Sequence, residues 1–456
     1  MSDPADGLAG KLGLSSIVLF GVAYMAPAIV VSTFGVIAAT TRGTAPTAYL
    51  VATAAMLLTA LSYGKMARLF PKSGSVYTYA RNMLNSHLGF LAGWAILLDY
   101  LFLPMVAWLI QSTYLNAQFP AVPVWAWLVI NIVITTGINI LGIVLADRVN
   151  KTLLTLTVVG LVALVVVCAH YLATNQHGPG AHALWNPSST AATVSAGAAI
   201  TAYSFLGFDA VSTLSEETRN PRRTIPRGIV LTVLVGGVIF VITSFVLQWA
   251  HPGGQFADED SAGYAMTVLV GGRAFADVMN IVILLGGFAS GLAIQASTSR
   301  LLYVMGRDGV LPRRFFGHLH RTLRTPVPNL LLIGAAATLA LSLSLATATS
   351  FINFGAFLGF TTVNVCAIAH YTRQKRAGER LSPLGYVFLP ALGAAVDIYL
   401  LTQLSSTALY LGLGWLALGT AYLAALTRGF RREPPEFDPT EHPATRVTDP
   451  DANTVR

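Results

Sequence analysis

Long apolar segments, separated by short polar ones, recur from near the first residue to about residue 427. Each apolar segment holds roughly 20 residues, the length that an α-helix needs to cross ~30 Å of hydrocarbon. The pattern predicts an all-α membrane protein with about 12 transmembrane helices. The predicted helix cores are 15–40, 46–69, 87–113, 122–143, 149–172, 193–214, 227–250, 273–303, 327–346, 349–371, 384–404 and 407–427.

Basic residues fall almost entirely in alternate connections of this pattern. If both ends of the chain lie on one side, 26 of the 28 Lys and Arg residues share that side, and only Arg42 and Arg273 lie opposite. Cytoplasmic loops carry such an excess, so we expect a multi-pass protein of the inner (cytoplasmic) membrane with both termini in the cytoplasm. Residues 1–13 then form a cytoplasmic tail, and residues 431–456, rich in Pro, Asp, Glu and Thr, are expected to be disordered.

Helix-breaking residues occur inside the first and the sixth predicted spans. Gly21 and Pro27 bracket part of span 1, and Pro27 lacks the N–H that a continuous helix would use. Gly207 interrupts span 6. The two breaks are five spans apart, and an odd offset inverts the second unit in the membrane, as in transporters with inverted repeats. We predict two discontinuous helices that meet at the midplane; a simple kink at each residue is the alternative.

These breaks also suggest how the chain is organised. The predicted transporter domain covers residues 14–430. Its first repeat covers about 14–172 and its second about 193–371, and two further helices follow at about 384–427.

Two carboxylates lie at membrane depth beside these breaks, Asp209 in span 6 and Asp99 in span 3. A charge in the bilayer costs several kcal/mol unless it faces a cavity or a partner, so both are candidates for a binding site. A protonated carboxyl bonded to nearby backbone is the alternative for Asp99. Glycines and aromatic residues surround the acids in the sequence. The predicted substrate-binding residues are Asp209, Asp99, Tyr24, Gly21, Tyr203, Phe205, Gly207, Phe208, Tyr100 and Trp94.

Further polar residues extend this set. On an α-helix Asp209, Ser212, Thr213 and Glu216 would share one face. Glu216 and Glu217 could thus continue a cation path or form a gate, although pairing with nearby arginines as a cytoplasmic cap is the simpler interpretation. In span 8, Ser290, Ser297 and Ser299 are candidates for an ion site or for close helix packing. Asp397, in span 11, lies outside both repeats, which favours a structural role.

Several motifs resemble those of the amino acid–polyamine–organocation (APC) superfamily. The segments 205–218, with Asn220, Pro221 and Pro226, and 70–79 carry this resemblance, and the segments 21–35, 98–104 and 299–308 are most similar to the bacterial putrescine importers. The resemblance covers about 12–430. It implies a leucine-transporter-type fold of five plus five helices with two more, and secondary active uptake.

The residues themselves favour a cationic substrate. Amino acid carriers of this type hold the substrate carboxylate on free N–H groups at a half-helix end, but here that run is Tyr24-Met25-Ala26-Pro27, which is bulky and lacks one N–H. Two acids and several aromatic faces suit ammonium groups instead. We therefore expect a diamine such as putrescine, or another polyamine. A cationic or broad-range amino acid permease, working as a symporter or an exchanger, is the alternative.

The coupling ion is less defined. Proton-coupled amino acid members of the superfamily place a lysine in span 5, and span 5 has none beyond Lys151; it carries Thr155 and Thr157. We expect a proton, with sodium as the less favoured ion.

Other classes of protein lack support in the sequence. Only 11% of residues are charged, far fewer than in soluble domains, and the basic loops reflect topology rather than nucleic-acid binding. No metal-ligand cluster, phosphate-binding loop or serine-nucleophile motif is visible. We therefore expect no enzyme activity, catalytic residue, metal or cofactor. A channel is a further alternative, and it would differ from a carrier because it would show no counterflow. Cys168 and Cys366 lie inside apolar spans and are expected to pack as small hydrophobic residues.

Overall fold

The computed structural model describes residues 12–71, 75–141, 147–175, 178–323 and 325–435. The regular elements in these ranges are helices, most of them α-helices, with 3₁₀ segments η2, η3 and η4 and a π-helical turn η5. Their bounds are α1 Leu14–Tyr24, α2 Ile29–Ser32, α3 Phe34–Thr40, α4 Ala45–Leu69, α5 Ser75–Met83, α6 Ser86–Gln118, α7 Val124–Ile140, α8 Asp147–Thr174, α9 Ala181–Leu184, α10 Ala191–Thr201, η2 Ala202–Phe205, η3 Asp209–Glu217, α11 Pro221–Ala250, α12 Ala262–Arg307, α13 Arg313–Phe316, α14 Val327–Ala337, η4 Thr338–Ser342, α15 Leu345–Arg376, η5 Leu384–Phe388, α16 Leu389–Thr402 and α17 Ser406–Leu426.

In the described ranges, ten helical segments are long and apolar enough to cross a membrane. Two shorter apolar segments, Val124–Ile140 and Val327–Ser342, occupy the places predicted for the fourth and ninth spans. The all-helical prediction is therefore confirmed. The segment predicted at 273–303 begins earlier, because α12 starts at Ala262 and bends at Gly272, where φ is 75°. Glycine adopts that left-handed conformation without the penalty that a side chain would bring.

Polar residues at the membrane boundaries begin several of these helices. Asn85, Thr190, Ser344 and Ser405 each accept a hydrogen bond from a backbone N–H of the first turn of α6, α10, α15 and α17, respectively. Such caps satisfy N–H groups that the first turn leaves without a helical partner. The predicted boundaries therefore agree with local chemistry as well as with hydropathy.

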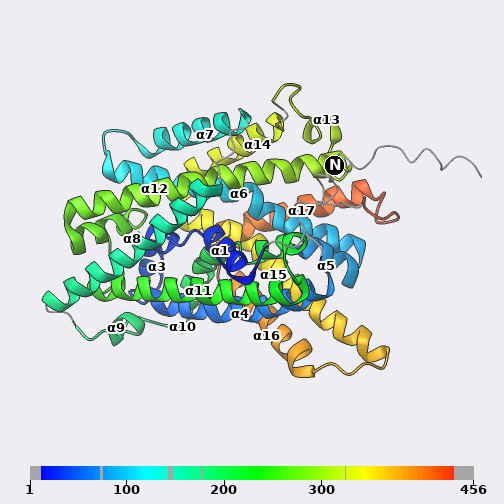
Figure 1. Cartoon of the computed structure of the whole chain (residues 1–456), viewed down its shortest axis with the longest axis horizontal. Coiled ribbons are helices and arrows are strands. Elements are labelled where there is room, and N and C mark those ends of the chain that lie inside the picture. Colours follow the sequence, from blue (N-terminus) through cyan, green and yellow to red (C-terminus); the bar gives the residue numbers. More distant parts are fainter. Residues whose placement is uncertain (1–11, 72–74, 142–146, 176–177, 324, 436–456) are drawn as a thin grey trace, which may run out of the picture.

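The short helix α1 lies at the centre of the bundle. In Figure 1, α6 and α12 run on one side of it and α4 and α11 on the other. The most extensive contacts between helices include those of α4 with α11, α6 with α12, and α6 with α15, while α1 packs against α11 and η3. A broken segment thus lies among long, regular helices that hold it in place.

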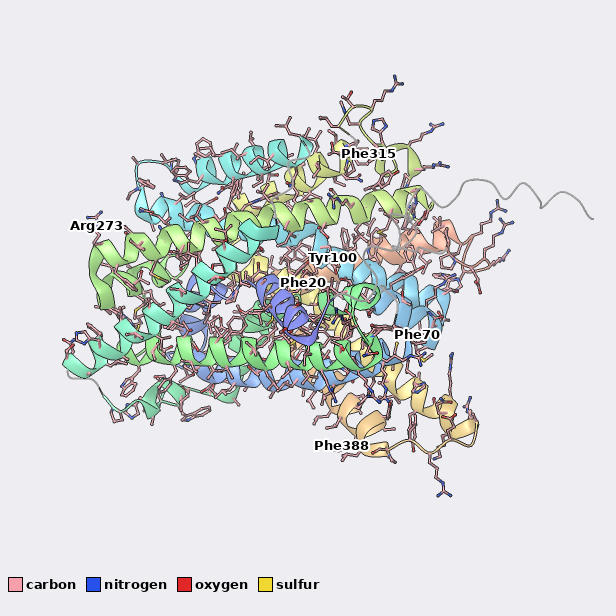
Figure 2. The ribbon with its side chains drawn as sticks, viewed as in Figure 1. Phe20, Phe70, Tyr100, Arg273, Phe315 and Phe388 are labelled. Carbon is pink, nitrogen blue, oxygen red and sulfur yellow. The ribbon has the colours of Figure 1, made fainter. Side chains whose placement is uncertain are left out.

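Residues predicted to lie on opposite sides of the membrane are found toward opposite ends of the long axis. Figure 2 shows Arg273 at one end, and Phe70, Phe315 and Phe388 in the opposite half, with Phe388 at its lower edge. Arg273 was predicted to face away from the cytoplasm, and the other three lie in or beside predicted cytoplasmic connections. The arrangement agrees with that division, whereas which side is cytoplasmic stays a prediction.

Close backbone contacts pack α2 and α3 against the loop before α12 and the start of α12. A Cβ on Gly35 would lie 2.2 Å from the Glu259 carbonyl oxygen, and one on Gly263 would lie 2.1 Å from the Val31 carbonyl oxygen. The Tyr114 hydroxyl also donates to the Val31 carbonyl, at 3.0 Å. The loop before α12 therefore lies directly on the second half of span 1.

Candidate functional site

Span 1 is interrupted as the sequence predicted. The helix α1 ends at Tyr24, Ala26 has a φ of 46°, and helical structure resumes at Ile29. Pro27 lies inside the gap and cannot donate a backbone hydrogen bond. The break between residues 24 and 29 therefore leaves backbone groups outside any regular helix.

Span 6 is interrupted at Gly207. The chain runs from α10 into η2, turns at Gly207 with a φ of 109°, and continues as η3. A Cβ on Gly207 would lie only 2.1 Å from Cδ1 of Tyr24. The ring of Tyr24 thus rests on the Gly207 backbone, so the breaks of spans 1 and 6 touch one another.

The second half of span 6 differs from the prediction in its helix type. Residues 209–217 form a 3₁₀-helix, which has three residues per turn rather than 3.6. Asp209, Ser212 and Ser215 consequently follow one edge: each serine hydroxyl donates to the carbonyl three residues earlier, at 2.7 Å and 2.6 Å. Thr213 is exposed and lies off that edge, so the predicted face that joins it to Asp209 and Ser212 is wrong, and the side chain of Glu216 lies outside the described residues.

The two predicted acids have different surroundings. Asp209 is 6% exposed, and the backbone N–H groups of Gly207, Asp209 and Ala210 at the break lie near its carboxylate. Asp99, on α6, is partly exposed, yet its Oδ1 atom is buried and has no hydrogen-bond partner. Asp209 thus lies beside the polar backbone groups of the break, whereas Asp99 keeps an oxygen that can accept a further donor.

Tyrosines lie within electrostatic range of these acids. Asp99 and Asp209 interact with each other, and the Tyr24 and Tyr100 hydroxyls interact with both. Tyr203 interacts with Asp99. Five of the predicted residues therefore form one cluster, contributed by spans 1, 3 and 6.

A cavity of about 340 Å³ lies next to this cluster, among α1, α6, α8, η2 and α12. Its size falls near the lower end of the usual range for small-molecule sites, ~300–1,000 Å³. No charged side chain belongs to its described lining, which is largely apolar. Its polar lining residues are Tyr24, Ser32, Gln111, Thr157, Tyr203, Ser290 and Ser297. Tyr24 and Tyr203 belong both to the cavity and to the acid cluster, so they join the two.

Four other predicted residues lie away from the cavity lining. Phe205 packs edge-on against Phe240 of α11, with ring centroids 5.2 Å apart, and Phe208 packs 5.1 Å from Phe360 of α15. Gly21 allows α1 to approach α11, since a Cβ there would lie 2.5 Å from Oγ1 of Thr232.

Trp94 is also directed elsewhere. Its indole N–H donates to the Trp415 carbonyl at 2.9 Å, and the Trp415 indole N–H donates to the Trp94 carbonyl at the same distance. The rings stack with centroids 4.9 Å apart. The side chain of Trp94 thus points toward α17 and links α17 to α6.

The gating prediction falls on side chains that the structure does not describe. Glu216 and Glu217 belong to the backbone of η3, but their side chains lie outside the described residues. A cation path or a cap at these positions stays a prediction.

Sequence reasoning gave less weight to the wall that α12 forms. Ile283, Gly286, Ser290, Ala293 and Ser297 of α12 all line the cavity. Their spacing of three or four residues is the signature of one helical face, and the small side chains along it could have identified that face. Gln111 was missed because a single amide in an apolar span has no distinguishing pattern.

Broken helices around a central cavity with buried acids define a class of multi-pass membrane transporters. Residues 16–421 match the profile of the Amino acid permease family. The match covers most of the chain, so the chain belongs to the amino acid permease family, whose members are transporters rather than enzymes. The predicted family is confirmed, and it implies a leucine-transporter-like arrangement.

Curated relatives cover nearly the whole chain. It is 40% identical over 433 residues to the low-affinity putrescine importer PlaP of Escherichia coli strain K12, with 94% of this chain and 96% of the relative covered. It is 26% identical to the methylthioribose transporter of Bacillus subtilis strain 168, with 91% and 93% covered. It is also 26% identical to the branched-chain amino acid permease BcaP of the same organism, with 81% and 83% covered.

Proposed function

We propose that this transporter imports a cationic amine, putrescine or another polyamine, by alternating access coupled to protons. In this proposal the chain lies in the cytoplasmic membrane with both ends in the cytoplasm. Its transporter domain consists of two inverted five-helix repeats and two further helices. A cationic or broad-range amino acid permease is the second candidate, because BcaP belongs among the relatives.

The observation that carries the proposal is the unpartnered oxygen of Asp99. A buried acceptor without a donor costs free energy, about 1–3 kcal/mol and more for a charged group. An ammonium group would supply both a donor and a compensating charge. The buried Oδ1 atom of Asp99 therefore favours a ligand that carries a positive nitrogen.

The second ammonium group of a diamine would need an acceptor or a negative charge of its own. Asp209 lies within electrostatic range of Asp99, and Tyr24 and Tyr203, which interact with these acids, also line the cavity. The faces of tyrosine rings attract desolvated cations by up to about 2 kcal/mol. The largely apolar cavity suits the methylene chain between two ammonium groups. Together these features favour a diamine over a zwitterion, for which the described lining offers no basic partner.

The name of the relative PlaP, a putrescine importer, supports the same substrate class. The relatives also include a methylthioribose transporter and a branched-chain amino acid permease. Family membership alone therefore does not decide the substrate, whereas the acids and tyrosines of this chain favour a cationic amine.

Proton coupling follows from the same acids. A carboxyl group that binds an amine as a carboxylate can hold a proton when the amine has left, so one group can serve both ligands. Thr157 and Ser290 place neutral oxygens in the cavity wall, which are also suited to sodium. A direct comparison of the two ions is therefore part of the test.

Transport by the purified full-length protein in liposomes tests the proposal. We expect uptake of labelled putrescine that an imposed inward proton gradient stimulates and a sodium gradient does not. Unlabelled putrescine and other polyamines should compete, whereas alanine and leucine should not. Counterflow against preloaded putrescine would distinguish a carrier from a channel. Strong competition by alanine would instead support an amino acid permease.

A further inference from the structure

A second group of buried polar residues lies between α4, α15 and α16, with no residue in the cavity lining. Asp397 of α16 is 0% exposed, and its Oδ2 atom accepts hydrogen bonds from the Thr59 hydroxyl at 2.9 Å and from the Asn364 amide at 3.0 Å. The same amide lies 3.0 Å from the Thr59 hydroxyl oxygen. All three residues are completely buried.

Both donors serve the same oxygen of the carboxyl group. The other oxygen, Oδ1 of Asp397, is buried without a partner, and so is Oδ1 of Asn364. Two buried acceptors in one cluster therefore lack a donor, and unsatisfied buried acceptors are rare in native proteins. Gly393, one turn before Asp397, leaves room for the amide: a Cβ there would lie 3.0 Å from both terminal atoms of Asn364.

Among the residues that the structure describes, no Lys, Arg or His side chain bonds to Asp397. Lys65 of α4 donates to the Gly385 carbonyl and lies 5.1 Å from the ring centre of Tyr386 in η5. On α15, His370 packs on the same Tyr386 and Arg373 donates to the Asn82 carbonyl at 2.9 Å.

Neutral titratable groups also lie on α16 and on the helices packed against it. Tyr399 of α16 donates to Ser195 of α10 at 3.1 Å, Cys366 of α15 is a buried free thiol, and Tyr63 of α4 packs on Phe208 and Phe360. An ionised Asp397 would thus be a buried charge without a counter-ion, which is strongly unfavourable.

We propose that Asp397, Asn364 and Thr59 form a proton-binding site, separate from the substrate cavity, in which Asp397 is a neutral carboxylic acid. A proton on Oδ1 removes the charge and converts an unsatisfied acceptor into a donor. Asn364 Oδ1, in the same cluster, is a buried acceptor that lacks a donor. A metal cation would require a shell of several oxygens, whereas a proton requires one acceptor.

The bound proton has a structural consequence. It allows α16, which lies outside both predicted repeats, to bury a carboxyl group against α4 and α15. The unfolded chain would release this proton near neutral pH, because an exposed Asp is ionised there. Folding then takes up a proton, so rising pH must lower the stability of the wild type relative to a variant with a permanently neutral side chain.

Infrared spectroscopy of the purified full-length protein tests the site directly. We expect the wild type at neutral pH to show the carbonyl band of a protonated carboxyl, and Asp397→Asn to lack it. The comparison is best made in an Asp99→Asn, Asp209→Asn background, which removes overlapping signals. Asp397→Asn itself should fold, and its melting temperature should fall less than that of the wild type as pH rises.

Thr59→Val provides a test that keeps the acid. Loss of the Thr59 donor should shift the frequency of the Asp397 band. Ser62 lies on the same helix as Thr59, and its buried hydroxyl has no hydrogen-bond partner. The control variant Ser62→Ala should therefore leave the frequency of the Asp397 band unchanged. Absence of any band assignable to Asp397 at neutral pH would overturn the proposal. So would stabilisation by sodium that Asp397→Asn abolishes, since that result would identify a metal cation as the occupant.

Discussion

At the scale of single residues, Asp99 and Asp209 illustrate how the same side chain acquires different roles. Asp209 closely follows Gly207, whose positive φ interrupts the helix, so its carboxylate lies near backbone N–H groups of the break. Asp99 lies in the middle of a continuous helix, where the backbone N–H groups are already used. Its free oxygen therefore depends on a donor from outside the protein.

We predict that Asp99→Asn lowers putrescine uptake strongly. A hydrogen bond to a charged group contributes about 1.5–3 kcal/mol, which corresponds to roughly a 10- to 100-fold loss of affinity. Binding of labelled putrescine to the purified variant, together with its amount in the membrane, measures this effect. Glu379→Gln, an exposed acid in a connection, is the matched control and should transport like the wild type. Unchanged affinity in Asp99→Asn would contradict the assignment.

Asp209→Asn should abolish uptake while the protein still inserts into the membrane. Asparagine keeps the size and shape of the side chain, but the carboxylate charge that interacts with Tyr24 and Asp99 is lost. Uptake normalised to the amount of protein in the membrane is the measurement. Full activity in this variant would remove Asp209 from the mechanism.

Gly207→Ala should abolish uptake for a steric reason. The added Cβ would lie 2.1 Å from the Tyr24 ring, and alanine is disfavoured at a φ of 109°. Gly137→Ala, in α7, is a suitable control because a Cβ there meets nothing within 4 Å. Uptake and thermal stability of both variants should be compared. Normal uptake in Gly207→Ala would mean that the contact between the two breaks is not needed.

At the scale of helices, α17 is fixed to the bundle by a reciprocal pair of tryptophans. Trp94 and Trp415 stack, and each donates its indole N–H to the other's carbonyl. Gly419 makes room for this contact, because a Cβ there would lie 2.2 Å from the Trp94 ring. In the apolar membrane interior, packing and hydrogen bonds rather than the hydrophobic effect hold helices together.

We predict that Trp415→Phe destabilises the protein without changing its substrate preference. One indole donor is lost and the stacking is reduced, which should cost about 1–2 kcal/mol. A lower melting temperature in detergent, with the same order of competition among amines, would confirm this. Trp125→Phe, at a position that is 61% exposed, is the control and should have little effect. A changed substrate preference would instead favour a direct role for Trp94 in binding.

Some features of these elements could not be foreseen. The α-helical spacing used for span 6 failed because residues 209–217 are wound as a 3₁₀-helix. The hydroxyls of Ser212 and Ser215 bond to carbonyls three residues back, yet serine does the same in other settings. Helix type here depends on packing against neighbouring helices, and the composition of the segment does not encode it alone.

At the scale of the whole molecule, orientation in the membrane is the main open prediction. Single cysteines can test it, because Cys168 and Cys366 are buried and should react little. In intact cells, a membrane-impermeant maleimide should label Arg273→Cys and not Phe315→Cys, which should react only after permeabilisation. Both positions are exposed and lie at opposite ends of the molecule (Figure 2). The wild type serves as the background, and the reverse pattern would contradict the proposed orientation.

The sequence alone determined the features that depend on local chemistry. Apolar length predicted the helices, Gly and Pro predicted the breaks of spans 1 and 6, and buried acids marked the candidate site. These follow because a bilayer requires every spanning backbone group to be hydrogen-bonded, so each interruption or charge stands out. Several aromatic residues were assigned to the cavity, although Trp94, Phe205 and Phe208 pack elsewhere.

Only the tertiary structure decided which side chains meet. It placed Tyr24 and Tyr203 in both the cavity lining and the acid cluster, turned Trp94 toward α17, and placed Thr59 and Asn364 beside Asp397. In an apolar span most faces look alike in the sequence, because lipid and protein interior are both hydrophobic. The direction in which each helix faces is set by contacts between residues far apart in the chain.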